Sequence, residues 1–263
     1  MDAREINLKN ENYADDLLRL ALDVGEGMLK NGGEISRVED TIERICRAYG
    51  AEHVEVFTII SVINASVRLK DGSYSSQMRR VKSTGMNLTV LEKLNGLSRE
   101  VCRDVPSLAY FDERIHELKN LRVYSPVVSM LAWALAAASF TVFFGGGLWD
   151  CLWAALAGVA MFCIESYSPK RMNAIAKNVM SSFVASFIAG ISVLVHSGSN
   201  GGEIIMGSLM LLVPGVAIGT AMRDIFCGDL LAGTLKLLQS CLSALMLAFG
   251  YVLAVSLMGG GAI

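Results

Sequence analysis

The stretch Val123–Phe144, VYSPVVSMLAWALAAASFTVFF, contains no charged residue and is long enough to cross a lipid bilayer as a helix. A hydrocarbon core about 30 Å thick needs roughly 17 to 25 helical residues. Four more apolar stretches follow it, at Leu148–Ile164, Val179–His196, Ile204–Met222 and Leu237–Met258. The sequence therefore predicts an α-helical integral membrane protein with about five transmembrane helices in residues 123–263. Residues 1–122 form a hydrophilic block ahead of them.

Basic residues at the span ends predict an orientation, because Lys and Arg beside a span resist translocation and collect on the cytoplasmic side. They occur before the first span, between the second and third spans, and between the fourth and fifth spans. The residues concerned are Arg122, Lys170, Arg171, Lys177, Arg223 and Lys236. The other connections and the tail Gly259–Ile263 contain no Lys or Arg. We expect a multi-pass protein of the cell membrane with a cytoplasmic N-terminus and its C-terminus outside.

Composition excludes several classes of protein. The chain has 263 residues, of which 53% are hydrophobic, and a formal net charge of -2; its mean hydropathy is +0.46. This leaves room for one small soluble domain and one membrane domain, and suggests no nucleic acid partner. The six cysteines form no C-x-x-C pair and the three histidines are far apart, so we expect reduced thiols, no metal site and no cofactor. Met1–Asn10 is polar and is neither a secretory signal nor a transit peptide.

The hydrophilic block predicts an N-terminal α+β cytoplasmic domain. Helical spacing runs over Ala14–Lys30, stops at Asn31-Gly32-Gly33, and resumes from Ser36 to Gly50. Ser36 and Glu39 have the spacing of a capping box, in which both side chains bind backbone amides at the helix start.

A change to β-branched residues over Val54–Leu69 predicts two or three strands. Asp71-Gly72 predicts a two-residue hairpin turn with positive φ. Helical spacing returns at Leu88–Val101 and Leu108–Leu121. The segment Gln77–Ser83, which contains Arg79, is either a solvated strand edge or a basic ligand or lipid site.

The block has no pattern typical of an enzyme. Phosphate-binding loops, dinucleotide fingerprints and nucleophile elbows are all absent from the sequence. We therefore expect no catalytic residue.

Few charged residues occur within or beside the spans, where a charge is costly unless it faces a cavity or a partner. Asp150 and Glu203 lie at predicted outer ends and are expected to be solvated. Glu165 ends the second span and could carry protons or cap the interface.

The fourth span contains Pro214-Gly215 near its middle. Proline has no amide hydrogen, so the Met210 carbonyl loses its usual donor and the helix kinks or breaks. Open backbone groups at membrane depth are tolerated beside protein or water, and broken helices of this kind bind substrates in secondary transporters. A plain packing kink is the alternative, with Gly207, Gly215 and Gly219 allowing close helix contact.

Arg223, Asp224 and Asp229 follow this span, between its end and the next one. They could form a gate or a carboxyl-binding site, or they could be topology determinants at the interface with water.

The chain resembles the threonine/serine exporter family in several motifs taken together. These are Gly32–Glu39 (GGEISRVE), Thr58–Ser66, Val213-Pro214-Gly215, Arg223-Asp224 and Gly228-Asp229. The resemblance implies a cytoplasmic domain followed by a multi-span part. Single-chain members look like fusions with roughly twice as many spans, so this chain resembles the larger subunit of the split form. The resemblance therefore implies a partner, which is a smaller multi-span membrane subunit. A homo-oligomer or higher oligomer is the alternative.

The resemblance also implies export of a small-molecule substrate, either threonine and serine or a dicarboxylate such as succinate, by a proton-driven alternating-access cycle. In it, Pro214-Gly215 exposes backbone groups to the substrate, Arg223 pairs with a substrate carboxylate, and Asp224, Asp229 or Glu165 carries a proton. The other candidate residues belong to the family motif: Gly33, Ser36, Arg37, Glu39 and Thr58. The rival function is a membrane-anchored ligand-sensing or scaffold protein, which has no need for a broken span.

Overall fold

The computed structural model describes residues 13–82, 85–119, 124–169, 172–195 and 199–259. The chain divides into two compact units. The first comprises Met1–Val123 and Ala217–Leu237, and the second comprises Tyr124–Val216 and Leu238–Ile263. The predicted domain boundary at residues 122 and 123 stays a prediction.

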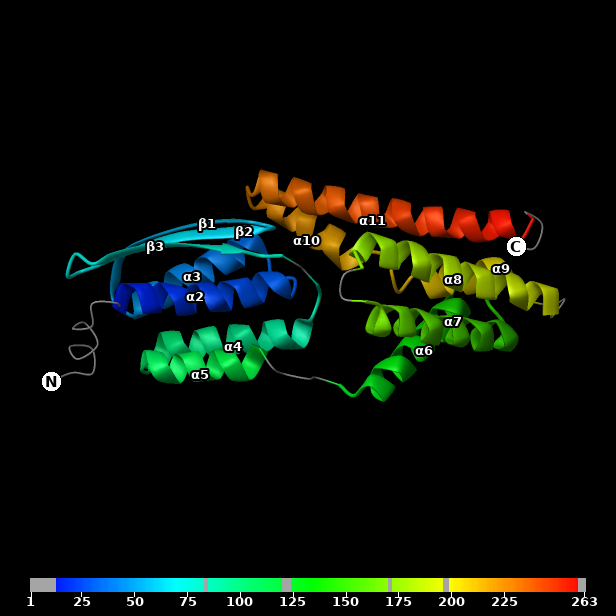
Figure 1. The fold of residues 1–263 in the computed structure, drawn as a ribbon, viewed down its shortest axis with the longest axis horizontal. Coiled ribbons are helices and arrows are strands. Elements are labelled where there is room, and N and C mark those ends of the chain that lie inside the picture. Colours follow the sequence, from blue (N-terminus) through cyan, green and yellow to red (C-terminus); the bar gives the residue numbers. More distant parts are fainter. Residues whose placement is uncertain (1–12, 83–84, 120–123, 170–171, 196–198, 260–263) are drawn as a thin grey trace. The chain divides into compact units, whose positions relative to one another are not determined.

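The first unit is built in layers around the helix α2 (Figure 1). A three-stranded antiparallel sheet in the order β1-β2-β3 lies against α2 and α3, and α4 and α5 pack on the other side of α2. The elements are α2 (Tyr13–Lys30), α3 (Ile35–Ala48), β1 (Ala51–Ile59), β2 (Val62–Leu69), β3 (Tyr74–Arg80), α4 (Leu88–Asp104) and α5 (Leu108–Lys119). This order confirms the predicted N-terminal α+β fold.

Helix α2 is covered on more than one side, which explains why its buried apolar residues occupy much of its circumference. Leu17, Leu18, Leu20 and Leu22 are all fully buried although they point in different directions around the helix. Burying such a side chain contributes about 1.5–3 kcal/mol relative to leaving it exposed. The apolar face of β2 completes this core through alternate residues, as its period-2 pattern requires.

The hairpin between β2 and β3 forms where it was predicted, but the prediction of a two-residue turn is wrong. The amide of Gly72 donates to the Leu69 carbonyl (3.1 Å). The paired residues of β2 and β3 that lie nearest to the turn are Arg68 and Tyr74. Gly72 has φ +87°, whereas Asp71 does not have positive φ. The Asp71 carboxylate instead accepts the Ser73 amide (2.9 Å), and this side-chain bond holds a longer turn that needs one glycine.

The capping box at Ser36 and Glu39 is also wrong. Helix α3 begins at Ile35 with Glu34 as its N-cap residue, so Ser36 already lies inside the first turn and cannot cap it. The Glu39 carboxylate is used elsewhere and accepts the backbone amide of Thr58 on β1 at 2.6 Å.

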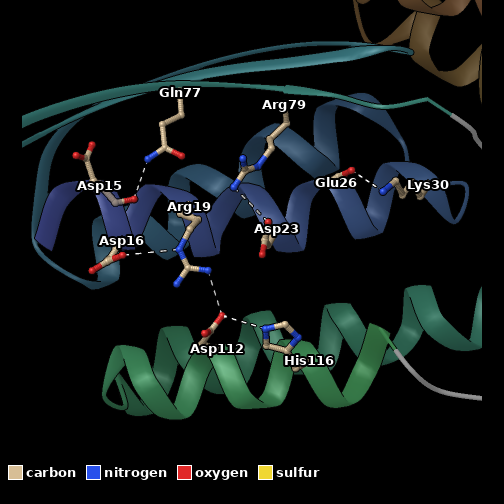
Figure 2. A network of polar contacts seen from close by, with 10 residues as sticks. All are labelled: Asp15, Asp16, Arg19, Asp23, Glu26, Lys30, Gln77, Arg79, Asp112 and His116. Atoms are coloured by element: carbon tan, nitrogen blue, oxygen red, sulfur yellow. Dashed lines mark hydrogen bonds and ion pairs between the residues drawn. The ribbon is translucent and has the colours of Figure 1, made fainter. Parts of the chain in front are cut away.

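Polar contacts hold the edge strand and α5 to α2 (Figure 2). Arg79 on β3 pairs with Asp23 on α2 at 3.5 Å, and Gln77 donates to a backbone carbonyl of α2 at 2.8 Å. Arg19 on α2 pairs with Asp112 on α5 at 3.2 Å. These internal partners favour the strand-edge interpretation of the basic segment; Ser83, its last residue, lies outside the described residues.

The second unit contains most of the apolar helices. Four helices are long and apolar enough to cross a membrane within the described part of the chain: α6 (Pro126–Phe143), α7 (Leu148–Tyr167), α8 (Ala174–Val195) and α11 (Leu230–Leu257). The remaining predicted span is divided into α9 (Gly201–Leu209) and α10 (Gly215–Phe226). This confirms the predicted multi-span helical architecture and the break at Pro214. Arg122, Lys170, Arg171 and His196, used above for orientation and span ends, lie outside the described residues.

Small residues bring the helices of the second unit close together, as is usual in membranes. A Cβ at Gly158 on α7 would lie 2.7 Å from the Trp133 carbonyl of α6, and one at Gly250 on α11 would lie 2.4 Å from the Val179 carbonyl of α8. A Cβ at Gly207 on α9 would lie 2.1 Å from Thr141 Oγ1 on α6. The predicted close contact is therefore confirmed for Gly207. At Gly215 and Gly219 a Cβ would meet no described atom within 4 Å.

The expectation that Asp150 is solvated is wrong. Its side chain accepts the amides of Gly147 (2.9 Å) and Asn200 (3.1 Å), and the residue is only 3% exposed. These bonds cap the start of α7 and hold the segment before α9, because unpaired amides at a helix start need an acceptor. Glu203 is half-buried rather than solvated, and its Oε2 is buried without a hydrogen-bond partner among the described residues.

Candidate functional site

The turn between α10 and α11 packs against the N-terminal elements within the first unit. Ala232, in the first turn of α11, is 3% exposed and belongs to the same apolar cluster as the core around α2. Gly233 lets α11 approach α10, because a Cβ there would lie 2.8 Å from the Ala221 carbonyl. Gly228 has φ +101° and reverses the chain after α10. The turn thereby brings its charged residues to the motifs near the N-terminus.

Arg223 on α10 forms an ion pair with Glu34, the N-cap residue of α3. The Glu34 side chain is 18% exposed and also lies 3.6 Å from Arg37, so one carboxylate is shared between two guanidinium groups. The Arg223 side chain is 62% exposed. It is therefore accessible to another carboxylate.

Asp224 and Lys236 form a buried ion pair between α10 and α11. Asp224 Oδ2 accepts Lys236 Nζ at 2.6 Å, and the two side chains are 1% and 16% exposed. Asp224 Oδ1 is buried and has no hydrogen-bond partner among the described residues. Such an oxygen in a native structure commonly marks a bound water, an ion or a functional position.

Two further carboxylates lie close by: Asp229 is within electrostatic reach of this pair, and Glu39 is within electrostatic reach of Asp229. Burial raises the pKa of Glu39. The hydrogen bond that its carboxylate accepts from the Thr58 amide opposes that rise, and the charge of Asp229 adds to it. Burial also raises the pKa of Asp229, the charge of Asp224 adds to the rise, and Lys236 opposes it. Raised pKa values make carboxyl groups able to take up a proton nearer to neutral pH.

Thr58 lies beside this group on the covered face of the sheet. It is 3% exposed, and its buried Oγ1 makes no hydrogen bond of ordinary geometry in the described part of the chain, although the hydroxyl lies close enough to the Glu39 carboxyl to lower that group's pKa. Together with Asp224 Oδ1, it provides a buried polar atom that a water molecule or a ligand group could satisfy.

The site thus combines an accessible guanidinium, four partly or fully buried carboxylates (Glu34, Glu39, Asp224 and Asp229) and two buried oxygens that lack a hydrogen bond of ordinary geometry among the described residues. An arginine binds a carboxylate ligand in a charge-assisted pair, and a carboxyl with a raised pKa can exchange a proton. The structure brings together five of the predicted residues: Arg223, Asp224, Asp229, Glu39 and Thr58.

Other predicted residues lie elsewhere. Pro214 and Gly215 belong to the second unit, at the start of the helix that carries Arg223, and the Gly215 amide donates to the Val213 carbonyl at 2.8 Å. Glu165 is also in the second unit, 55% exposed and paired with Lys177 at 3.2 Å. This contact fits the interfacial interpretation better than a buried proton carrier.

The motif residues before Glu39 have mainly structural contacts. The Gly33 amide donates to the Met28 carbonyl at 2.9 Å, and a Cβ at Gly33 would lie 2.9 Å from the same oxygen. Gly33 therefore permits the tight connection between α2 and α3. Ser36 is half-buried, and Arg37 is 67% exposed.

Sequence reasoning missed Glu34 and Lys236 as site residues. Lys236 was interpreted as an orientation signal and Glu34 only as part of a motif. The missing signal was charge balance, because Arg223 and Asp224 each need a partner of opposite sign once they are partly buried.

Comparison with known proteins gives one family and several relatives. A family described as "Putative threonine/serine exporter" matches residues 19–258. The "Probable succinate transporter subunit YjjP" of Klebsiella aerogenes is 26% identical over 95% of this chain and 96% of that protein. The protein of the same name from Escherichia coli K12 is 25% identical over 92% and 94%. "Pheromone-regulated membrane protein 10" of Debaryomyces hansenii is 26% identical over 76% of this chain and 20% of that protein. No solved structure matches significantly.

The buried ion pair predicts an asymmetric response to mutation. Lys236→Met leaves the buried Asp224 carboxylate without its counterion and is expected to cost about 3–5 kcal/mol of stability. Asp224→Asn should cost less, because the Lys236 ammonium can extend toward water. Thermal unfolding of the purified protein in detergent measures both. Equal losses, or a larger loss in Asp224→Asn, would contradict this account of the pair.

Glu39 predicts a pH dependence of stability. Its folded pKa is raised, so its stabilising contribution is complete below the ordinary glutamate pKa and is lost as pH rises through the folded value. Glu39→Gln keeps an acceptor oxygen for the Thr58 amide but carries no charge. We expect this variant to have the higher unfolding midpoint at pH 7 and no advantage near pH 4. The exposed Glu92→Gln is the control, and parallel profiles for Glu39→Gln and wild type would refute the assignment.

Proposed function

Because the chain belongs to the threonine/serine exporter family, which matches residues 19–258, we propose that it is one subunit of a proton-coupled secondary exporter. The match confirms the resemblance inferred from the sequence motifs. Family membership supports a role in membrane transport rather than an enzymatic one. The exported compounds are small polar metabolites that carry a carboxylate, either threonine and serine or a dicarboxylate such as succinate.

The observation that carries the proposal is the ion pair between Arg223 and Glu34. A guanidinium that already holds a carboxylate has the geometry to hold that of a substrate. In the proposed cycle, the substrate carboxylate replaces Glu34 on Arg223. This exchange costs little free energy for two reasons. Arg223 is exposed, and Glu34 keeps Arg37 as a partner when it leaves Arg223.

Proton coupling is proposed for the neighbouring carboxyl groups. Asp229 is the favoured proton carrier, because burial and the charge of Asp224 raise its pKa. Glu39 is a further candidate, because burial and the charge of Asp229 raise its pKa. Asp224 is held by Lys236, and Glu165 by Lys177. An opposite charge favours the ionised form of a carboxyl, so these two are less suited to releasing and regaining a proton.

The break at Pro214-Gly215 is proposed to expose backbone groups to the substrate. Helix α9 is too short to cross a bilayer alone, so the pathway here depends on interrupted helix ends. A Cβ at Gly215 would meet no described atom within 4 Å, which leaves space for a ligand or for another chain.

A second membrane protein is the proposed partner. The K. aerogenes and E. coli relatives are named as subunits and match over nearly their full lengths. We propose a smaller multi-span subunit that supplies the other half of the pathway, with a homo-oligomer as the alternative.

The proposed orientation puts the N-terminal domain in the cytoplasm and the C-terminus outside. Fusing alkaline phosphatase after Ile263 should give an active enzyme, and fusing green fluorescent protein there should give no fluorescence. The opposite pair of results would reverse the orientation.

Efflux of labelled threonine, serine and succinate from preloaded cells tests the function. We expect export only when this chain is expressed with the multi-span protein encoded beside it. Pro214→Ala, Arg223→Gln and Asp229→Asn should each lower export about tenfold or more at unchanged abundance, because each loses one step of the cycle.

Arg47→Gln is the control, since this exposed arginine pairs with Glu43 on the same helix and lies outside the site. Normal efflux from all three site variants would contradict the residue roles. Absence of efflux for every substrate, with both chains in the membrane, would favour a ligand-sensing scaffold.

A further inference from the structure

A basic groove lies between α3 and α4, beside the charged site, with which it shares the neighbourhood of Glu34 through Arg37. Its volume is about 580 Å³, and four arginines line it: Arg37, Arg44, Arg99 and Arg103. Arg37 and Arg44 are about two turns apart on α3, and Arg99 and Arg103 about one turn apart on α4, so each pair lies on one helix face. Asp40 is the carboxylate that lines the groove with them.

The carboxylates nearby do not balance these charges. Arg44 pairs with Asp40 at 2.8 Å, and Arg103 forms two bonds of 2.8 Å to Asp104. Arg37 lies 3.6 Å from the Glu34 carboxylate, which also forms the ion pair with Arg223. For Arg99, no ion pair is found within the described part of the chain, and its side chain is exposed. The groove therefore holds guanidinium groups whose donors are still available.

We propose that this groove binds a phosphate-bearing anion. The planar guanidinium matches phosphate oxygens with two parallel bonds, and a phosphate offers enough oxygens for arginines from both helices at once. A carboxylate has only two oxygens and offers fewer acceptor sites to the four arginines than a phosphate does. The phosphate comes either from a soluble metabolite or from a lipid headgroup, which present the same chemistry.

Binding here would act on the neighbouring site through Glu34. Arg37 and Arg223 share that carboxylate, so an anion that draws Arg37 into the groove leaves Glu34 to Arg223 alone. The groove thus connects a regulatory ligand to the arginine proposed to hold the substrate. Binding itself is measured without transport, so its outcome is independent of the exporter proposal.

Isothermal titration of inorganic pyrophosphate into the full chain, held in nanodiscs of phosphatidylcholine, tests the site. Arg99→Glu should weaken binding about tenfold or more, because it removes charge-assisted bonds and adds a repulsive charge. Arg99→Gln should give a smaller loss. Arg47→Glu, on α3 but outside the groove, should leave binding nearly unchanged. Unfolding midpoints of all variants check that each is folded.

Nanodiscs that contain phosphatidylglycerol separate the two sources. If the headgroup is the occupant, native mass spectrometry should show this lipid retained by wild type and lost from Arg99→Glu, and pyrophosphate should bind more weakly in its presence. If the occupant is soluble, pyrophosphate should bind equally in both lipids. The proposal is overturned if the wild-type protein binds neither pyrophosphate nor phosphatidylglycerol. It is also overturned if Arg47→Glu weakens binding as much as Arg99→Glu does.

Discussion

Backbone hydrogen bonding in hydrocarbon is the constraint on which the membrane part of this protein depends. A peptide group within the bilayer must find its partner inside the protein, so a spanning segment is helical unless a proline prevents it. Within the described residues, four helices long enough to span the bilayer are continuous, whereas Pro214 separates α9 from α10. The break gives the chain a helix end, and the helix beyond it carries Arg223 and Asp224 toward the N-terminal motifs.

Charge pairing then determines the candidate site. Glu34, the N-cap residue of α3, pairs with Arg223 on α10, although the two are 189 residues apart. Glu39 on α3 lies within electrostatic reach of Asp229 in the turn between α10 and α11. Partly buried charges need partners, and each pair fixes the position of one element against another. The motifs that contain Glu39, Thr58, Arg223-Asp224 and Gly228-Asp229 therefore all lie within the first unit, whereas Val213-Pro214-Gly215 lies in the second. Their convergence is a physical reason for treating them as one functional site.

Particular residues show how far the sequence could predict this structure. The apolar stretches, the proline break and the strand hairpin all follow from local pattern, and all are present. The turn at Asp71 was wrong in detail, because the Asp71 carboxylate accepts the Ser73 amide and holds a longer turn. The start of α3 was wrong because the helix begins at Ile35, after Glu34 and without a side-chain cap, so Ser36 lies inside the first turn. Asp150 was expected in water, and it is buried because it caps one helix and holds a distant segment. In the site, Glu39 was explained as a local cap when its partner is Thr58 on the next element.

Local sequence pattern is enough to locate the segments that are apolar enough to span a membrane, the place where one of them breaks, and the order of helices and strands before them. These properties depend on residues within a few positions of one another, through helix and strand periodicity and the missing amide of proline. The pairing of the charges, by contrast, follows from the folded chain alone. The attraction between Arg223 and Glu34, or between Asp224 and Lys236, depends on distance in space and on burial, neither of which spacing along the chain records.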